Sequence, residues 1–402
     1  MKENEKISTA VSWNWLCVLV VILVSTNLRS PITAVGPVLG QISEDLQLNT
    51  FQSSLLTAIP LFMFASCSVA VSRYSHIQGM HRFLLFGLVI LSAGIILRVW
   101  GNIPMLFTGS FLIGLGICVG NVVTPGYIKT NFPKQIGLMT GIFAVAMNLT
   151  AAFASGFSLR LGTWTGLEWR GSLGVWVILA LLSLLAVFFD GLSGRKVITI
   201  PENKQAANGI GHIFRSRLAW YISLFMGIQS LVYYSLISWL PNVLVAYGMP
   251  SKDTGWLLFL IQIAMIPIMF IGPILANRMK DQRLMVSLVA IGMLGSIFIF
   301  WHYKLQGIYV AAILLGLSNG LSFSLSILFF TLRARSTANA IKISGMAQSV
   351  GYLIAAFGPP VFGKLHEIDA TWNSSFYFLA GSILLLLFAG WKAGEDRYVT
   401  ED

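Results

Sequence analysis

Charged residues are scarce in this chain of 402 residues. Asp, Glu, Lys and Arg together make up 10% of it, against about 25% in a typical soluble domain. Hydrophobic residues reach 56%, and the mean hydropathy is +0.78. This composition argues against a soluble enzyme and predicts an all-α integral membrane protein that crosses the bilayer many times.

Residues that build disulfide frameworks, metal sites and phosphate loops are also few. The three cysteines, Cys17, Cys67 and Cys118, lie in apolar stretches without metal-ligand spacing. The five histidines fall in loops or at the ends of apolar runs, and no Gly-x-x-x-x-Gly-Lys-Ser/Thr string occurs. We therefore expect no metal, no cofactor and no enzymatic activity, and no direct drive by nucleotide hydrolysis.

Twelve apolar runs are long enough to cross a bilayer, which takes about 20 helical residues. A polar, basic stretch, which cannot be buried in hydrocarbon, separates the first six runs from the last six. The sequence predicts a six-helix bundle over residues 1–190, a cytoplasmic linker over 191–216 and a second six-helix bundle over 217–402. The spans are predicted at residues 13–37, 51–72, 82–100, 104–128, 136–160, 171–190, 217–245, 254–277, 284–302, 307–331, 338–363 and 373–392.

Basic residues are distributed unevenly among the loops. With a cytoplasmic N-terminus, about 18 Lys and Arg fall on the inner side and about 6 on the outer side, as the positive-inside rule requires. The formal net charge of +11 is thus explained by membrane orientation. We expect both termini in the cytoplasm, a lipid bilayer around the protein and no nucleic-acid partner.

The two halves share sequence features at an offset of 204 residues. Pro37 then aligns with Pro241, and residues 151–153 (Ala-Ala-Phe) align with the same three residues at 355–357. A duplicated six-helix unit in a membrane protein usually places a substrate path between the halves, near the bilayer midplane. We expect such a path here.

The strongest single signal is Arg29, which lies inside the first predicted span. A charge at that depth costs at least about 2.5 to 3.5 kcal/mol. All 15 acidic residues fall in loops, tails or helix ends, and the one nearest to the interior of a span, Asp190, is at the end of the sixth. On a helix, Ser25, Arg29 and Thr33 would share one face. That face is predicted to look into a cavity with uncompensated positive charge.

Two interpretations of Arg29 remain open at this stage. Its guanidinium offers a planar fork of donors, which suits an anion or a nitro group. Alternatively, the side chain snorkels to an interface or binds backbone carbonyls freed by Pro31 and Pro37. The first interpretation makes Arg29 the substrate anchor.

Polar residues recur at helical spacing in other spans. In the seventh span, Ser230, Tyr234 and Ser238 repeat every four residues, with Gln229 and Tyr233 on the adjoining face. At the 204 offset, Tyr233 is the counterpart of Arg29. For each such residue the alternative is a helix–helix hydrogen bond. Further candidates for substrate contact are Thr33, Asn121, Asn148, Asn319, Gln348 and Tyr352.

The six-plus-six plan with a basic central loop resembles the major facilitator superfamily. Residues 272–283 resemble its loop signature, with Asn277 where an aspartate is usual, and residues 72–82 resemble a weaker first copy. The resemblance implies a gating loop that includes Arg73, Asn277 and Arg278.

Three segments resemble more closely the branch of cyanate permeases and 2-nitroimidazole transporters. They are Asn27–Pro31, Ile237–Pro241 and Ser344–Tyr352. This resemblance implies secondary transport of small polar or anionic compounds through a central cavity in a bacterial cell membrane, and we expect a functional monomer. The resemblance implies that residues of these segments contact the substrate, namely Asn27, Arg29, Trp239, Gln348 and Tyr352.

We therefore expect a secondary active transporter that works by alternating access. Its halves would rock about a midplane site where Arg29 holds a small anionic or nitro-bearing substrate. A multidrug exporter of the same fold is one alternative, although it would favour cations and an intramembrane acid. A passive anion channel or a membrane sensor is another.

Overall fold

The computed structural model describes residues 15–78, 80–132, 135–192, 213–335 and 337–399. Within these ranges the chain is helical and contains no strand. The N-terminal half comprises α1 (Trp15–Thr26), α2 (Ser30–Thr33), α3 (Val35–Leu46), α4 (Thr50–Gln78), α5 (Met80–Trp100), α6 (Ile103–Asn131), α7 (Ile136–Thr165), α8 (Glu168–Gly174) and α9 (Val177–Leu192). The C-terminal half comprises α11 (Arg217–Ala246), α12 (Ser251–Arg278), α13 (Arg283–Phe298), the π-helix η2 (Ile299–Tyr303), α14 (Ile308–Leu332), α15 (Thr337–Ile368) and α16 (Asn373–Ala393).

The predicted all-helical membrane fold is confirmed. Eleven stretches within the described ranges are long and apolar enough to cross a bilayer. The helix α15 occupies the place of the eleventh predicted span but is not one of those eleven stretches. Of the predicted linker, residues 193–212 lie outside the described residues.

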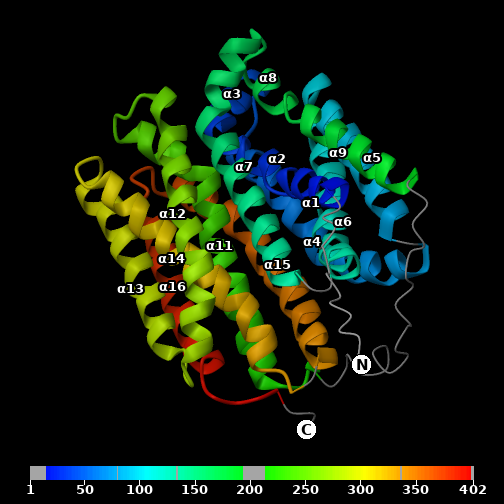
Figure 1. Cartoon of the computed structure of the whole chain (residues 1–402). Helices are drawn as coiled ribbons and strands as arrows, with labels where there is room; N and C mark the ends of the chain where they lie inside the picture. The colour runs from blue at the N-terminus through cyan, green and yellow to red at the C-terminus, as the bar shows by residue number, and fades with distance from the viewer. Residues whose placement is uncertain (1–14, 79, 133–134, 193–212, 336, 400–402) are drawn as a thin grey trace, which may run out of the picture.

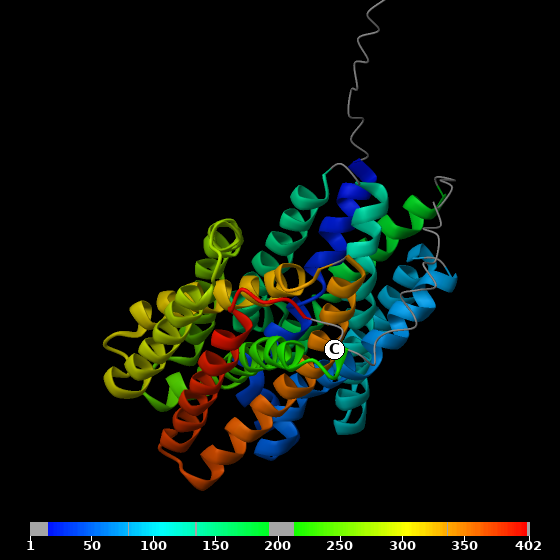
Figure 2. The same cartoon turned by 90° about the horizontal axis from the view of Figure 1, so that it is seen from below.

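The two halves lie side by side (Figures 1 and 2), with α13, α14 and α16 on one flank and α5, α6 and α9 on the other. Between them, α4 packs on α15, α7 packs on α12, and α3 packs on α11. These three helix pairs form the interface between the halves. Any path between the halves therefore runs along this interface.

A close backbone contact joins α3 to α11. Pro241 lacks an N–H, so it leaves the carbonyl of Ile237 without its helical donor. That carbonyl faces Gly36, where an added Cβ would come within 2.1 Å of the oxygen. Only glycine permits this approach, which closes the halves together at the end of the molecule that carries α8 (Figure 1).

The first predicted span is not a single helix, contrary to the expectation for residues 13–37. The chain leaves the helix after Thr26, and α2 and α3 follow as separate short helices. Pro31 cannot donate a backbone hydrogen bond, and the N–H groups of Asn27 and Leu28 bond three residues back instead of four. Arg29 lies at this break with φ −128°. The four-residue spacing predicted that Arg29 lies on one face of a continuous helix, and this prediction is wrong.

The C-terminal end of α3 is tied to α8. Asp45 accepts hydrogen bonds from Trp169 Nε1 at 2.9 Å and from Arg170 Nη1 at 2.8 Å. These two bonds hold the pKa of the Asp45 carboxyl below its ordinary value, the indole bond being the larger cause. The contacts fix the end of the broken first span against the same half.

Candidate functional site

Arg29 is buried between the halves, with 7% of its surface exposed. Its Nη1 donates a 2.6 Å hydrogen bond to Oδ1 of Asn148 on α7. Its guanidinium carbon lies 5.2 Å from the ring centre of Tyr233 and 5.1 Å from that of Phe323. Among the described residues, no carboxylate forms an ion pair with Arg29. The guanidinium thus keeps its positive charge among neutral amide and aromatic groups.

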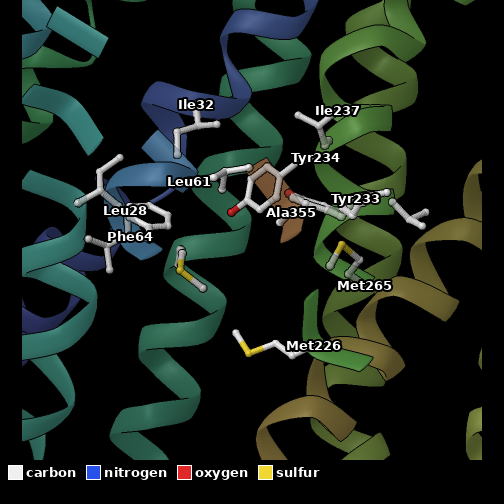
Figure 3. Packing of buried hydrophobic residues seen from close by; sticks show 14 of the residues in the cluster. Leu28, Ile32, Leu61, Phe64, Met226, Tyr233, Tyr234, Ile237, Met265 and Ala355 are labelled. Atoms are coloured by element: carbon white, nitrogen blue, oxygen red, sulfur yellow. The ribbon is translucent and has the colours of Figure 1, made fainter. Parts of the chain in front are cut away.

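A small pocket surrounds this guanidinium. Arg29 is the one lining residue from the N-terminal half, and α11, α12, α14 and α15 supply the rest. In Figure 3, Tyr233 and Tyr234 extend from α11 toward the side where Leu28 and Ile32 lie. The cavity volume open to a water-sized molecule is about 10 Å³, which is room for about one water. The lining residues are Arg29, Gln229, Ser230, Tyr233, Tyr234, Met265, Phe323 and Tyr352.

A layer of hydrogen bonds closes the pocket on the side toward α8. Gln262 of α12 donates through Nε2 to Ala151 O at 2.9 Å and to Ser155 Oγ at 2.7 Å, both on α7. Its Oε1 accepts from the Tyr233 hydroxyl at 3.3 Å. The hydroxyl of Thr33 donates to the same Ala151 carbonyl at 3.2 Å. Gln262 therefore joins a pocket-lining ring to the opposite half of the molecule.

A second layer lies farther from the pocket in the same direction. Ser238 of α11 donates to Thr57 Oγ1 of α4 at 2.8 Å, again across the halves. The close approach of Gly36 to Ile237 lies on the next helix pair. In this state the pocket is sealed toward α8 by contacts that a rocking motion would have to break.

The predicted site residues divide into two groups. Arg29, Tyr233, Tyr234 and Tyr352 line the pocket together, and Asn148 contacts the guanidinium directly. These residues come from four separate predicted spans, which the fold brings to one point.

The other predicted residues do not line this pocket. Asn27 donates to Ser183 Oγ at 2.7 Å and so fastens α1 to α9. Trp239 Nε1 donates to Pro359 O at 3.0 Å, and Gln348 donates to Ser344 Oγ at 2.9 Å within α15. Asn121 is half-buried, and Asn319 is buried. For Asn27 and Trp239 the helix–helix alternative describes their contacts.

Of the predicted gating loop, Arg73 lies in α4, and Asn277 and Arg278 end α12. Arg278 is exposed at the end of α12. The side chains of Arg73 and Asn277 lie outside the described residues.

Sequence reasoning missed several residues of the site. Met265 and Phe323 line the pocket as apolar side chains, and nothing in their local pattern separates them from residues that face lipid. Gln262 is fully buried, and its position as an amide inside an apolar run was the available signal. Arg98 of α5 is 1% exposed and is a second buried arginine inside a span.

Comparison with known proteins assigns the family. Residues 15–359 match the model of the Major Facilitator Superfamily. The chain belongs to the major facilitator superfamily. It is 35% identical over 398 residues to the 2-nitroimidazole transporter of Escherichia coli, covering 98% of this chain and 99% of that protein. It is 24% identical over 384 residues to the cyanate transport protein CynX of the same organism, covering 94% and 97%.

The fold of this superfamily member agrees with a solved structure as well. The D-xylose-proton symporter superposes with a TM-score of 0.75 at 13% identity, covering 95% of this chain and 97% of that one. The resemblance to the cyanate and 2-nitroimidazole branch is therefore confirmed, and the chain is a multi-pass membrane transporter with bacterial relatives.

Proposed function

We propose that the protein is a secondary active transporter of small, planar anionic or nitro-bearing compounds, and that Arg29 is the group that holds them. The observation that carries this proposal is a buried guanidinium whose described neighbours are Asn148 and aromatic rings. A carboxylate partner would neutralise the charge, whereas an amide oxygen leaves it available to an incoming anion. The guanidinium fork matches the planar pair of oxygens in a nitro or carboxylate group.

The aromatic rings around Arg29 limit the size and shape of the ligand. Tyr233 and Phe323 lie beside the guanidinium, and Tyr234 and Tyr352 complete the wall. Because the cavity has room for about one water in this state, a ligand must displace a ring. Small flat molecules require the least displacement and gain ring contacts on their faces.

The position of the pocket between the halves supports alternating access as the transport mechanism. The Gln262 layer and the Ser238–Thr57 contact close one side. Opening that side requires these cross-half bonds to break. A ligand that moves the Tyr233 ring also moves its hydroxyl, which donates to Gln262, and so disturbs this layer of hydrogen bonds. Ligand binding would in this way alter the relative free energies of the closed and open states.

The experiment is thermal unfolding of the purified protein in detergent with nitrate, cyanate, 2-nitroimidazole and, as the opposite class, tetraphenylphosphonium. A ligand at 100 times its Kd stabilises the folded state by about 2.7 kcal/mol. We expect stabilisation by at least one anion or nitro compound, and its loss in Arg29→Ala. Arg29→Lys retains the charge without the fork and should recover only part of the effect.

Arg397→Ala is the matched control, because Arg397 is exposed and its 3.1 Å ion pair with Glu395 lies within the C-terminal half, away from the pocket. It should bind ligands as the wild type does. Stabilisation by tetraphenylphosphonium alone, unchanged in Arg29→Ala, would instead favour a multidrug exporter. Counterflow from vesicles preloaded with the stabilising compound separates a carrier from a channel, since only a carrier exchanges substrate faster when the far side is loaded.

A further inference from the structure

Arg98 is a second buried guanidinium that the proposed transport cycle does not use. It lies in the last turn of α5 and is 1% exposed. Its Nη1 donates a 2.7 Å hydrogen bond to the carbonyl of Pro31. Its Nε and Nη2 have no hydrogen-bond partner among the residues that the structure describes. Burying a charge with so few partners costs free energy, so a contribution to folding stability does not explain why Arg98 is there.

The single bond of Arg98 reaches the break that carries Arg29. Pro31 is the second residue of α2, two positions after Arg29 in the chain. The carbonyl of Arg29 accepts from the N–H groups of Ile32 and Thr33, each at 3.0 Å. Arg98 thus binds one carbonyl of α2, and the Arg29 carbonyl accepts the backbone hydrogen bonds of the first turn of the same short helix.

The backbone of Arg98 is itself fixed. At Gly109 of α6, an added Cβ would lie 2.5 Å from the Arg98 backbone nitrogen, so α5 and α6 touch here without an intervening side chain. The last turn of α5 also favours a positive charge through the helix dipole. Arg98 therefore extends from a rigid helix pair to a segment of four helical residues, which is too short to be stable alone.

We propose that Arg98 is a positioning residue for the substrate site, and that its bond to the Pro31 carbonyl holds the break so that the Arg29 guanidinium faces the pocket. This inference rests on the proposed role of Arg29. Loss of the bond would let α2 change its backbone geometry and move the anchor. The expected consequence is weaker ligand binding without weaker folding, because an apolar side chain removes the desolvation cost of the buried charge along with one hydrogen bond.

The test compares Arg98→Met and Arg98→Lys with the wild type, and Arg397→Met is the matched control, because Arg397 is exposed and pairs with Glu395 within the C-terminal half. The first readout needs no ligand and is hydrogen exchange of the peptide covering residues 27–36. In Arg98→Met we expect amides of this peptide to exchange at least about tenfold faster, with α1 and the melting temperature unchanged. In residues 27–36, Arg397→Met should exchange as the wild type does.

The second readout is the apparent Kd for whichever of nitrate, cyanate or 2-nitroimidazole stabilises the wild type. We expect at least about a tenfold increase in Arg98→Met and about a threefold increase in Arg98→Lys, whose shorter chain keeps a charged donor. If Arg98→Met does not fold, Arg98→Lys decides by both readouts. Wild-type exchange in residues 27–36 overturns the positioning role.

The two proposals fail in different ways. If Arg29→Ala binds normally, the Arg29 site is wrong, while faster exchange in Arg98→Met would still establish the hold on the break. If Arg29→Ala loses binding but the Arg98 variants keep wild-type exchange and Kd, the role of Arg98 alone is wrong.

Discussion

The first span of each half takes a different form, although an offset of 204 residues relates the two. The N-terminal one is divided into α1, α2 and α3, whereas α11 continues unbroken over 30 residues. Arg29 and Tyr233 occupy corresponding positions, and their side chains meet at 5.2 Å. The neutral Tyr233 lies on the continuous helix α11, and its hydroxyl donates a hydrogen bond to the amide oxygen of Gln262. The charged residue lies at a helix break, with an amide acceptor from a third helix.

Proline position explains part of this difference. Pro31 and Pro37 lie in the first turns of α2 and α3, where a missing N–H costs little but where each helix has to begin anew. Pro241 lies inside α11 and only frees the Ile237 carbonyl that Gly36 approaches. The pocket therefore has a charged side from the N-terminal half and a neutral aromatic side from the C-terminal half. Substitutions on either side test this difference.

The largest effect is expected from neutralising the charged side in place. Asn148→Asp would set a carboxylate at the 2.6 Å contact with Arg29 and form an ion pair there. We expect about a 100-fold loss of affinity for the stabilising anion or nitro compound, with a folded protein of similar melting temperature. Thermal-shift titration measures this.

Asn148→Ser is the neutral control for that substitution. It should keep affinity within about tenfold, since it removes one interhelical hydrogen bond, worth about 0.6 kcal/mol on average in a membrane, and adds no charge. Wild-type affinity in Asn148→Asp would show that the uncompensated charge of Arg29 is not what holds the ligand.

An intermediate effect is expected from Gln262→Leu. This substitution removes the two hydrogen bonds from α12 to Ala151 and Ser155 of α7. Each interhelical hydrogen bond in a membrane is worth about 0.6 kcal/mol on average, so the closed state should lose roughly threefold to tenfold in population. Spin labels at Thr163 and Lys252, both exposed at the ends of α7 and α12, report the separation of the halves.

Ser296→Ala is the control for Gln262→Leu, because its 2.8 Å bond to Ala311 O lies within the C-terminal half. It should leave the distance distribution unchanged. An unchanged distribution in Gln262→Leu as well would mean that this amide does not contribute to closing the halves.

The smallest effect is expected from Tyr233→Phe. The ring remains on the Arg29 guanidinium, while the hydroxyl loses its 3.3 Å bond to Gln262 and its contact with the guanidinium. The apparent Kd should change by about threefold or less. Tyr233→Leu removes the ring and its cation–π contact, worth about 0.5 to 2 kcal/mol, and should weaken binding more. Equal effects of the two variants would assign the role of Tyr233 to its hydroxyl instead of its ring.

Much of the fold and part of the site could be predicted from the sequence. Hydropathy is a local property, so the apolar runs predicted the helices of both halves, and the lack of acids in those runs set Arg29 apart. Helical spacing brought Tyr233, Tyr234 and Tyr352 into consideration, and all three line the pocket with Arg29. These features depend on residues within one span.

Only the tertiary structure decided which groups meet. Asn27 bonds α9 rather than lining the pocket, Asn148 rather than another amide contacts Arg29, and Phe323 enters the site from α14. The break at Arg29 and the reach of Arg98 to Pro31 depend on how α2, α5 and α7 pack. Contacts between helices are set by their relative rotation and depth, which the pattern within any single span does not contain.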